Sequence, residues 1–569
     1  MSALGARSVG RGWIGFALVF LVFLAHALWL IGVAEDAFIT FHFARNWLEG
    51  HGLVWNVGEG PVEGYTNFLW LVLMACVLGL GLDPIVCSQL LGVACALVAL
   101  VYTFRCATDL LGLGPLLGLV PCAFLAISGP FAAWATSGME TGLFTLLLVA
   151  SVYHLAAYWQ GVGGGVGEGD AEAGQQLVFA YAALLLAMLT RPEGVGVAGL
   201  LLGASVLASR GRAASSLRAH LAPGLACLVF YGVYFGWRWQ LFGHPLPNTF
   251  YAKTGASPAQ VLRGSQYVAY FALHFVTPWL PLLLLAASLL GARERAGSMV
   301  RPGWPELLRR HFGLAACALV SLVYTLYIAL VGGDYMAMYR FFVPVLPFVY
   351  LLLAASVAWV ATARGAAGGR VGPLLAAAVS LAVLGTAVHS TPLEKRLFER
   401  PWMTHGNYRG VEKERWHVAR LSLIGEFFAR YARPGESLAT AAIGAVAWHS
   451  DLRIYDLHGV VDPYIAHHGR VDAPVGSGQP GHEKFDYVYV FEKRPTFYMF
   501  NRRLFPQPFP GIPKLVDEVD ALVAQDYRVG SVRLVDEVNG ESGYFAFLER
   551  RDRVEGRERV EGRDRPGQR

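Results

Sequence analysis

Long apolar segments limit what this chain can fold into more than any other feature of its sequence. A helix needs about 20 mainly apolar residues to cross the roughly 30 Å hydrocarbon layer, because backbone amides cannot stay unpaired in lipid. The chain is 55% hydrophobic and only 15% charged. It is therefore predicted to be a polytopic membrane protein, an all-α bundle of about 11–12 hydrophobic helices. The candidate spans lie near residues 13–34, 67–82, 85–104, 113–128, 139–159, 177–190, 194–209, 220–238, 267–290, 313–331, 341–360 and 372–389.

Basic residues in short loops predict the orientation of this bundle. Lys and Arg close to spans are retained on the cytoplasmic side. The loops at 209–220, 291–312 and 361–372 each carry at least two Arg, and Arg7 and Arg11 precede the first apolar segment. The N-terminus is therefore expected inside, and the C-terminal third outside.

An inside start and an outside finish require an odd number of crossings. Segment 67–82 is short and lies between polar residues. If it is only half inserted, residues 35–84 form one outer loop, the first of the chain. The alternative lets 67–82 cross and merges 177–209 into one long span over Arg191 and Glu193. We favour the first topology, because a charge at mid-membrane costs about 2.5 kcal/mol or more.

The character of the sequence changes after about residue 395. Helical periodicity at 416–431, strand-like runs at 487–491 and 544–548, and Gly and Pro between them predict a mixed α/β domain. Residues 550–569 repeat Arg-Val-Glu-Gly-Arg and are expected to form a disordered tail. The chain thus divides into a transmembrane module over 1–394, an extracytoplasmic domain over 395–549 and the tail over 550–569.

Neither the net charge nor the cysteines point to a different class of protein. The tail holds eight Arg against five acids and so supplies +3 of the net charge of +5, which gives no support to a nucleic-acid partner. All seven cysteines lie in apolar stretches. This placement excludes a disulfide framework or a zinc finger from the polar C-terminal third.

Two acids at the outer end of the first span are the strongest candidates for chemistry. Glu35 and Asp36 open a short amphipathic helix that also contains Arg45 and ends at Gly50. A carboxylate at the lipid boundary could take the proton from a hydroxyl that attacks an anomeric carbon whose leaving group is a lipid phosphate. The two acids could instead only cap the helix, or hold a divalent cation as oxygen ligands.

Two other outer loops carry groups suited to a phosphate. Lys253, with Tyr251 and Asn248, offers an ammonium and neutral donors; the alternative is ordinary anchoring at the membrane interface. Asp334 and Arg340 lie six residues apart in a third outer loop. They could be only an ion pair that closes two helix ends.

Further polar residues on the expected outer face could contact an acceptor or serve the structure. They are Glu63, Tyr65, Asn67, Glu140, Arg191, Glu193, Asp462 and His482. Paired histidines and His482-Glu483 invite a zinc site, but no helical His-Glu-x-x-His or cysteine-pair spacing supports one, so we assign no metal ligands.

In order along the chain, these motifs resemble the polytopic GT-C glycosyltransferases. The most similar group is the one that contains the mycobacterial terminal β-(1→2)-arabinofuranosyltransferase. The stretches that carry the resemblance lie at 35–41, 50–56, 62–70, 136–140, 191–194, 247–253, 332–342, 462–463 and 481–484.

The resemblance implies a GT-C fold with a cavity on the outer face, and transfer with inversion from a polyprenyl-phosphate sugar. Asp36 would be the general base, Glu35 a supporting acid, and Lys253 and Arg340 partners of the donor phosphate. Tyr251, Asn248, Asp334 and Arg45 would also belong to the donor site. The sugar would be an arabinofuranose or another pentose, the acceptor a cell-envelope glycan or glycolipid, and the location the bacterial inner membrane.

Two other classes of protein also fit a chain with about a dozen spans. A secondary transporter is expected to show internal repeats with broken helices near the midplane, and no such halves are visible. A non-catalytic protein of envelope-polysaccharide assembly or export would show the same pattern of apolar segments. Loss of glycan transfer on replacement of Asp36 by Asn, in a protein that still inserts normally, would distinguish an enzyme from both.

Overall fold

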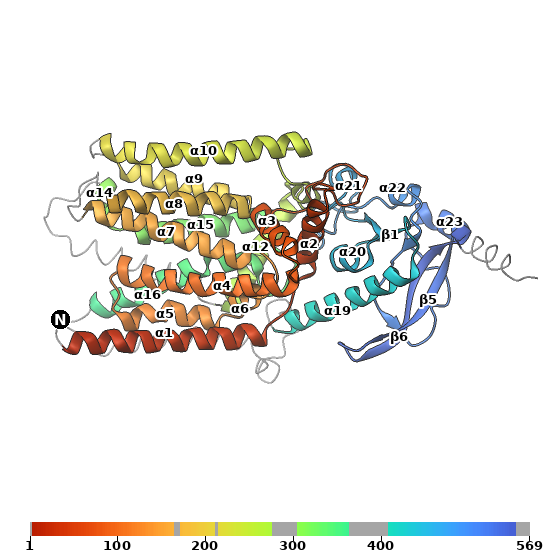
Figure 1. The fold of residues 1–569 in the computed structure, drawn as a ribbon, viewed down its shortest axis with the longest axis horizontal. Helices are drawn as coiled ribbons and strands as arrows, with labels where there is room; N and C mark the ends of the chain where they lie inside the picture. Colours follow the sequence, from red (N-terminus) through yellow and green to blue (C-terminus); the bar gives the residue numbers. More distant parts are fainter. Residues whose placement is uncertain (1–2, 164–170, 211–213, 276–303, 364–407, 554–569) are drawn as a thin grey trace, which may run out of the picture.

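The computed structural model describes residues 3–163, 171–210, 214–275, 304–363 and 408–553. Figure 1 shows an elongated molecule, with a bundle of long helices at one end and a mixed α/β domain, the C-terminal domain, at the other. Short helices lie at the junction between them. The predicted helical bundle with a C-terminal α/β domain is therefore confirmed.

The long helices lie side by side along the long axis of the molecule (Figure 1). They are α1 (Ala3–Trp29), α4 (Pro84–Arg105), α5 (Pro115–Ile127), α7 (Thr141–Gly163), α8 (Ala171–Thr190), α9 (Glu193–Ala208), α10 (Ala214–Phe242), α12 (Pro258–Phe275), α15 (Phe312–Val331) and α16 (Leu346–Ala363). A π-helical turn, η1 (Cys106–Leu110), continues α4. Five helices of the described chain are long and apolar enough to cross a membrane, and the bent pair of α5 and α6 (Gly129–Ala135) would make a sixth.

Large apolar side chains cover the outside of this bundle. On α10, for example, Leu228 is 71% exposed and Val233 is 68% exposed. An apolar surface of this extent marks contact with lipid or with a partner. Together with the length of the helices, it makes the chain a multi-pass membrane protein.

The two ends of the bundle differ in charge. The end far from the C-terminal domain holds the N-terminus and α14 (Trp304–Arg310), with Arg309 and Arg310 in its last turn (Figure 1). Arg309 donates a hydrogen bond to the carbonyl oxygen of Arg210, so two of the basic loops predicted from the sequence meet at this end.

Two helical segments decide between the alternative topologies. Helix α3 (Phe68–Gly79) has 12 residues and is about 18 Å long, which is too short to cross the bilayer, as the favoured topology expects. Helices α8 and α9 are separate, with a break at Arg191 and Pro192, and they pack side by side (Figure 1). The alternative that merges them into one span is therefore wrong, because the proline at the break stops a continuous helix.

Short elements connect the bundle to the C-terminal domain. They are α2 (Glu35–Leu48), α3, α6, α11 (Asn248–Lys253) and the 3₁₀ helix η2 (Arg340–Val345). Their apolar side chains join the two halves: the ring of Phe41 in α2 lies 6.0 Å from that of Trp448, which belongs to the C-terminal domain.

The C-terminal domain is built on a six-stranded sheet of order β2-β1-β3-β6-β4, with β5 paired to β6. β1 runs parallel to β2 and β3, whereas β6 is antiparallel to its neighbours. Its elements are α19 (Tyr408–Tyr431), β1 (Ser437–Thr440), α20 (Gly444–Ser450), β2 (Arg453–Asp456), α21 (Pro463–His468), α22 (Tyr487–Glu492), β3 (Phe497–Tyr498), β4 (Leu504–Phe505), α23 (Asp517–Asp526), β5 (Tyr527–Asp536) and β6 (Glu541–Arg550).

One of the two predicted strands of this domain is a helix. The helix expected at 416–431 and the strand expected at 544–548 are confirmed by α19 and β6. The alternating run at 487–491 instead forms α22, because the Asp486 side chain accepts a hydrogen bond from the Tyr489 amide and caps the turn.

The first residues of the expected disordered tail, 550–553, are ordered. Arg550 belongs to β6, and the buried Arg553 pairs with Glu436 and Glu549. These ion pairs hold residues 550–553 on the domain. The rest of the tail, the boundary expected at 394 and 395, the candidate span at 372–389 and most of the one at 267–290 lie outside the described residues.

A buried ion pair in α19 generates a stability prediction. The Arg420 side chain is fully buried, and its Nε lies 2.7 Å from Asp536. Arg420→Ala leaves that carboxylate buried without its partner and is expected to cost about 3–5 kcal/mol of stability. The measurement is the thermal midpoint of the purified full-length protein. Arg430→Ala, at an exposed position of the same helix, is the control and should change little; equal midpoints for both variants would contradict the prediction.

Candidate active site

The amino end of α2 lies between two helices of the C-terminal domain, α19 and α20. Ala34, the residue before α2, has no polar side chain with which to cap the helix. The amide of Glu35 instead donates a hydrogen bond of 3.1 Å to the Glu414 carboxylate from α19. The Glu35 carboxylate in turn accepts from the amides of Gly444 at 2.5 Å and Ala445 at 3.2 Å, at the start of α20.

The approach of α2 to α20 requires a glycine. A Cβ added to Gly444 would lie 2.4 Å from the Glu35 carbonyl oxygen, closer than any two such atoms can pack. The Glu35 side chain is therefore enclosed by the C-terminal domain. Burial, followed by the negative charges of Asp36 and Glu414, raises the pKa of Glu35 to about 8.

Asp36, the next residue, faces positive charge. Its side chain is 17% exposed, and the Arg340 guanidinium lies 3.6 Å away. Burial disfavours the charged form of Asp36, but the charges of Lys253 and Arg340 outweigh that effect and lower its pKa. Of the two acids predicted from the sequence, Asp36 is thus the one that stays ionised and can accept a proton.

Arg340 is held by a second acid. Its Nε and Nη2 donate to the two oxygens of Asp334 at 2.7 and 3.1 Å, and its guanidinium lies over the Trp134 ring. The predicted ion pair between Asp334 and Arg340 is therefore present, and it also aims Arg340 at Asp36. With its donors engaged in this way, Arg340 is better suited to orient Asp36 than to bind a ligand alone.

Lys253 is the less constrained cation of the site. It ends α11 and is half-buried, and its side chain packs on Gly481, where an added Cβ would lie 3.1 Å from Lys253 Cε. Within the described part of the chain, no hydrogen bond or ion pair engages its ammonium, although its charge acts on Asp36. An anionic ligand beside Asp36 would therefore find this ammonium available.

His482 approaches Asp36 from the C-terminal domain. Its Nδ1 donates to the Pro480 carbonyl oxygen at 3.1 Å, and its ring stands edge-on to Tyr335. Burial, with the neighbouring charge of His458, lowers the pKa of His482 to about 4, so the ring is neutral at physiological pH. Nδ1 holds the proton in this arrangement, which leaves Nε2 as a hydrogen-bond acceptor.

The residues after His482 fix the loop that carries it. Glu483 pairs with Arg263 of α12 at 2.8 Å, and Lys484 donates to the carbonyl oxygen of Tyr251 in α11 at 2.7 Å. The stretch at 481–484 therefore docks the C-terminal domain on α11 and α12. This docking brings Lys253 and His482 to the same place.

Several other predicted site residues serve the junction. Asn248 donates to the carbonyl oxygens of Gly459 and Val460 at 2.8 and 3.0 Å. The Tyr251 ring lies 4.3 Å from that of His467. Arg45 pairs with Asp451 at 2.8 Å, at the far end of α2 from Asp36. The structure thus places Arg45 away from the cluster around Asp36.

The remaining polar candidates form ion pairs and caps. Asn67 donates to Glu140 at 2.8 Å, and Arg191 bridges Glu140 and Glu193, which ties α3, α7 and α9 together.

Three more of these candidates join other elements. Glu63 forms a buried pair with Arg238 at 2.7 Å, and the Tyr65 ring packs on Phe43. Asp462 caps α21 and pairs with Lys493 at 2.9 Å. The structure supports the structural alternative for these residues.

Sequence reasoning did not identify Glu414. It lies near the start of α19, where the sequence reads as an ordinary charged helix, and no local motif marks it. Only the docking of α19 against α2 shows that this carboxylate belongs to the site.

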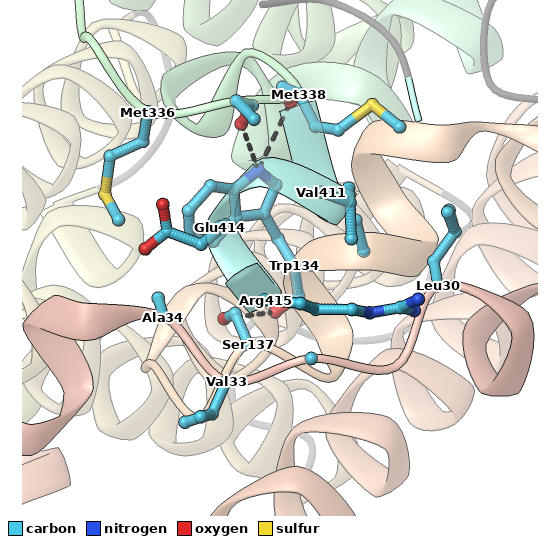
Figure 2. A pocket seen from close by; sticks show the side chains of 13 residues that line it. Leu30, Val33, Ala34, Trp134, Ser137, Met336, Met338, Val411, Glu414 and Arg415 are labelled. Carbon is cyan, nitrogen blue, oxygen red and sulfur yellow. Dashed lines mark hydrogen bonds between the residues drawn. The ribbon is translucent and has the colours of Figure 1, made fainter. Parts of the chain in front are cut away.

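A cavity opens beside Glu414, between the α1–α2 connection, α6, the segment at 336–338 and α19 (Figure 2). Its walls are largely apolar, and Trp134 donates from its indole to the carbonyl oxygens of Ala337 and Met338. The residues that line it are Leu30, Gly32, Val33, Ala34, Ala133, Trp134, Ser137, Met336, Ala337, Met338, Val411, Glu414 and Arg415.

The described residues contain no group of three or more His, Cys, Asp or Glu side chains arranged to hold a metal ion. The two acids proposed as cation ligands have other partners, since Glu35 accepts from amides and Asp36 faces a guanidinium.

Comparisons with known proteins agree with this architecture. The family described as "Domain of unknown function (DUF8728)" matches residues 407–547. The terminal β-(1→2)-arabinofuranosyltransferase of Corynebacterium glutamicum is 29% identical over 320 residues, which are 53% of this chain and 45% of the relative. The match thus spans less than half the length of that relative.

The crystal structure of ArnT from Cupriavidus metallidurans bound to undecaprenyl phosphate superposes with a TM-score of 0.52 at 13% identity. Its apo state superposes with a TM-score of 0.50 at 14% identity. In both comparisons the match covers 95% of this chain and 98% of the other. The chain therefore has the GT-C fold that its motifs indicated.

The raised pKa of Glu35 predicts how stability changes with pH. The folded protein holds this proton up to about pH 8, whereas an unfolded chain releases it near pH 4.3. Stability gained through the protonated group is therefore complete at low pH and is lost as pH rises between these values. Relative to Glu35→Gln, which has no proton to lose, the thermal midpoint of the unchanged protein should fall from pH 5 to pH 8. Glu49→Gln, exposed at the other end of α2, is the control; parallel curves for the unchanged protein and Glu35→Gln would contradict this expectation.

Proposed function

We propose that this protein is a GT-C glycosyltransferase that moves a sugar from a polyprenyl-phosphate donor to a cell-envelope glycan or glycolipid. The observation that carries the proposal is an ionised Asp36 with two cations, Lys253 and Arg340, beside it at the junction of the bundle and the C-terminal domain. The sequence similarity to an arabinofuranosyltransferase supports an arabinofuranose or another pentose as the sugar.

Asp36 acts as the general base in this proposal. It accepts the proton of an acceptor hydroxyl while the hydroxyl oxygen attacks the anomeric carbon. The bond from that carbon to the phosphate oxygen breaks, and the lipid phosphate leaves with the electron pair. Because attack and departure occur on opposite faces of the sugar, the configuration inverts. The proton is later released from Asp36 to water.

Lys253 binds the donor phosphate and stabilises the charge that develops on it. Its ammonium has no competing partner among the described residues, and an ammonium is well suited to a phosphate oxygen. Arg340 keeps Asp36 ionised and oriented. In this scheme the positive charge that stabilises the departing phosphate comes from Lys253. A divalent cation held by Glu35 and Asp36 would add to this charge, and adding EDTA to the transfer assay tests for such a cation.

The orientation follows from the charge of the two ends. The end with Arg210, Arg309 and Arg310 lies in the cytoplasm, and the end with Asp36 and the C-terminal domain lies outside the inner membrane. The C-terminal domain then faces the envelope, where it can hold the acceptor next to His482.

The decisive test is Asp36→Asn in a transfer assay. The full-length protein in lipid nanodiscs is incubated with a panel of polyprenyl-phosphate sugars that includes arabinofuranose, and consumption of each donor is measured. Loss of the base should lower the rate by about 100- to 10,000-fold. Glu49→Gln, on the exposed end of the same helix, should keep full activity. If Asp36→Asn transfers sugar at the unchanged rate, Asp36 is not the base.

Lys253→Met separates donor binding from proton transfer. Hydrogen bonds to charged groups contribute about 1.5–3 kcal/mol, so donor affinity should fall by about 10- to 100-fold. The pKa of Asp36 should also rise without this cation, which moves the acidic limb of the pH–rate profile to higher pH. Lys514→Met, at an exposed site of the C-terminal domain, is the control. An unchanged donor affinity would remove Lys253 from the donor site.

A further inference from the structure

Glu414 is the part of the site that the proposed chemistry leaves without a role. It belongs to the C-terminal domain, yet its carboxylate accepts the amide hydrogen of Glu35 at 3.1 Å, on the helix that carries Asp36. Figure 2 shows this carboxylate at the edge of the apolar cavity, on the side where Ala34 and Met336 lie. Its charge also interacts with those of Asp36, Arg340 and Asp334.

The contact fills a need that α2 cannot meet by itself. The first amides of a helix have no partner within the helix, and Ala34 has no side chain with which to cap them. A carboxylate at this end is favoured both by the hydrogen bond and by the helix dipole. Glu414 supplies this cap from a distant part of the sequence, 379 residues away from Glu35.

A second cap runs in the opposite direction. Glu35 accepts from the amides of Gly444 and Ala445 and so caps α20 of the C-terminal domain. Each of the two acids therefore caps a helix from the other half of the molecule. We call Glu35 and Glu414 the crossed caps. Both contacts are made by Glu35, the first residue of α2, so they fix the start of the helix next to Asp36.

We propose that Glu414 is a positioning residue for Asp36, which makes the transfer reaction depend on the docked C-terminal domain. Glu414 fixes the peptide between Ala34 and Glu35, one residue before Asp36, and the Asp36 side chain is thereby held toward Arg340, 3.6 Å away. A misplacement of about 1 Å can lower a rate by about 100-fold. This proposal rests on the proposed function of Asp36 as base.

The variants of Glu414 are chosen to separate the hydrogen bond from the charge. Glu414→Gln keeps an oxygen acceptor at the same reach, whereas Glu414→Ala removes the acceptor. Glu414→Asp keeps the charge but shortens the side chain by one methylene group. Glu412→Ala and Glu412→Gln are matched controls, because Glu412 is exposed on the same helix two residues earlier.

The first measurement is kcat and donor KM in nanodiscs, with whichever polyprenyl-phosphate sugar the unchanged protein consumes. Glu414→Ala and Glu414→Asp should lower kcat by about 10- to 100-fold with little change in donor KM. Glu414→Gln should restore most of the rate, and the Glu412 variants should match the unchanged protein. Full activity of Glu414→Ala, or a loss in Glu414→Gln as large as in Glu414→Ala, overturns the proposal.

The second measurement needs no turnover, and it distinguishes failure of this proposal from failure of the proposed function. Hydrogen exchange is followed in peptides that cover the first turn of α2. Exchange should be faster in Glu414→Ala and Glu414→Asp than in Glu414→Gln and the Glu412 variants. If α2 is protected equally in all of them, Glu414 does not position Asp36, whatever the reaction is. If the exchange differs as expected while Asp36→Asn remains active, the positioning contact stands and the assignment of Asp36 as base fails.

Discussion

An ionised carboxylate is costly to remove from water unless opposite charge and hydrogen bonds compensate for the loss. Asp36 is 17% exposed at a junction between two folded units, and it keeps its charge because Arg340 and Lys253 face it. Neither cation is adjacent to it in the sequence. Arg340 is aimed by Asp334, and Lys253 ends a short helix that packs on the loop of the C-terminal domain. The arrangement of α2, α11, η2 and that loop depends on this balance of charge.

The same junction joins the bundle to the C-terminal domain. Glu35 is the residue before Asp36, but its environment is the opposite: it accepts from two amides, and no ion pair to it is found among the described residues. The two neighbouring acids thus differ in protonation because burial and the charges of Asp36 and Glu414 raise the pKa of Glu35, whereas two cations lower that of Asp36. Environments that separate the pKa values of two acids are a common way to assign different roles to them.

The fold limits the range of possible activities less than the site does. A match to ArnT over 95% of the chain at 13% identity establishes the architecture, and one architecture can host many activities. What supports the proposed glycosyl transfer is an ionised carboxylate with an available ammonium beside it, at the end of the bundle opposite the basic loops. The apolar outer surface and the charge difference between the two ends explain why such a site would lie at a membrane boundary.

The sequence alone determined the bundle, the C-terminal α/β domain and the pair of acids that opens α2. The length of each apolar run shows which segments can span lipid, and the order of the motifs indicated the GT-C fold. Both signals can be read along the chain without knowing which distant residues are in contact. The structure was needed to show that 487–491 is helical, that Arg553 is held in the domain, and that Arg45 lies away from Asp36. It alone decided which acid stays charged and that Glu414 joins the site. A pKa and a crossed cap depend on which distant groups face each other in space, and sequence spacing does not contain that information.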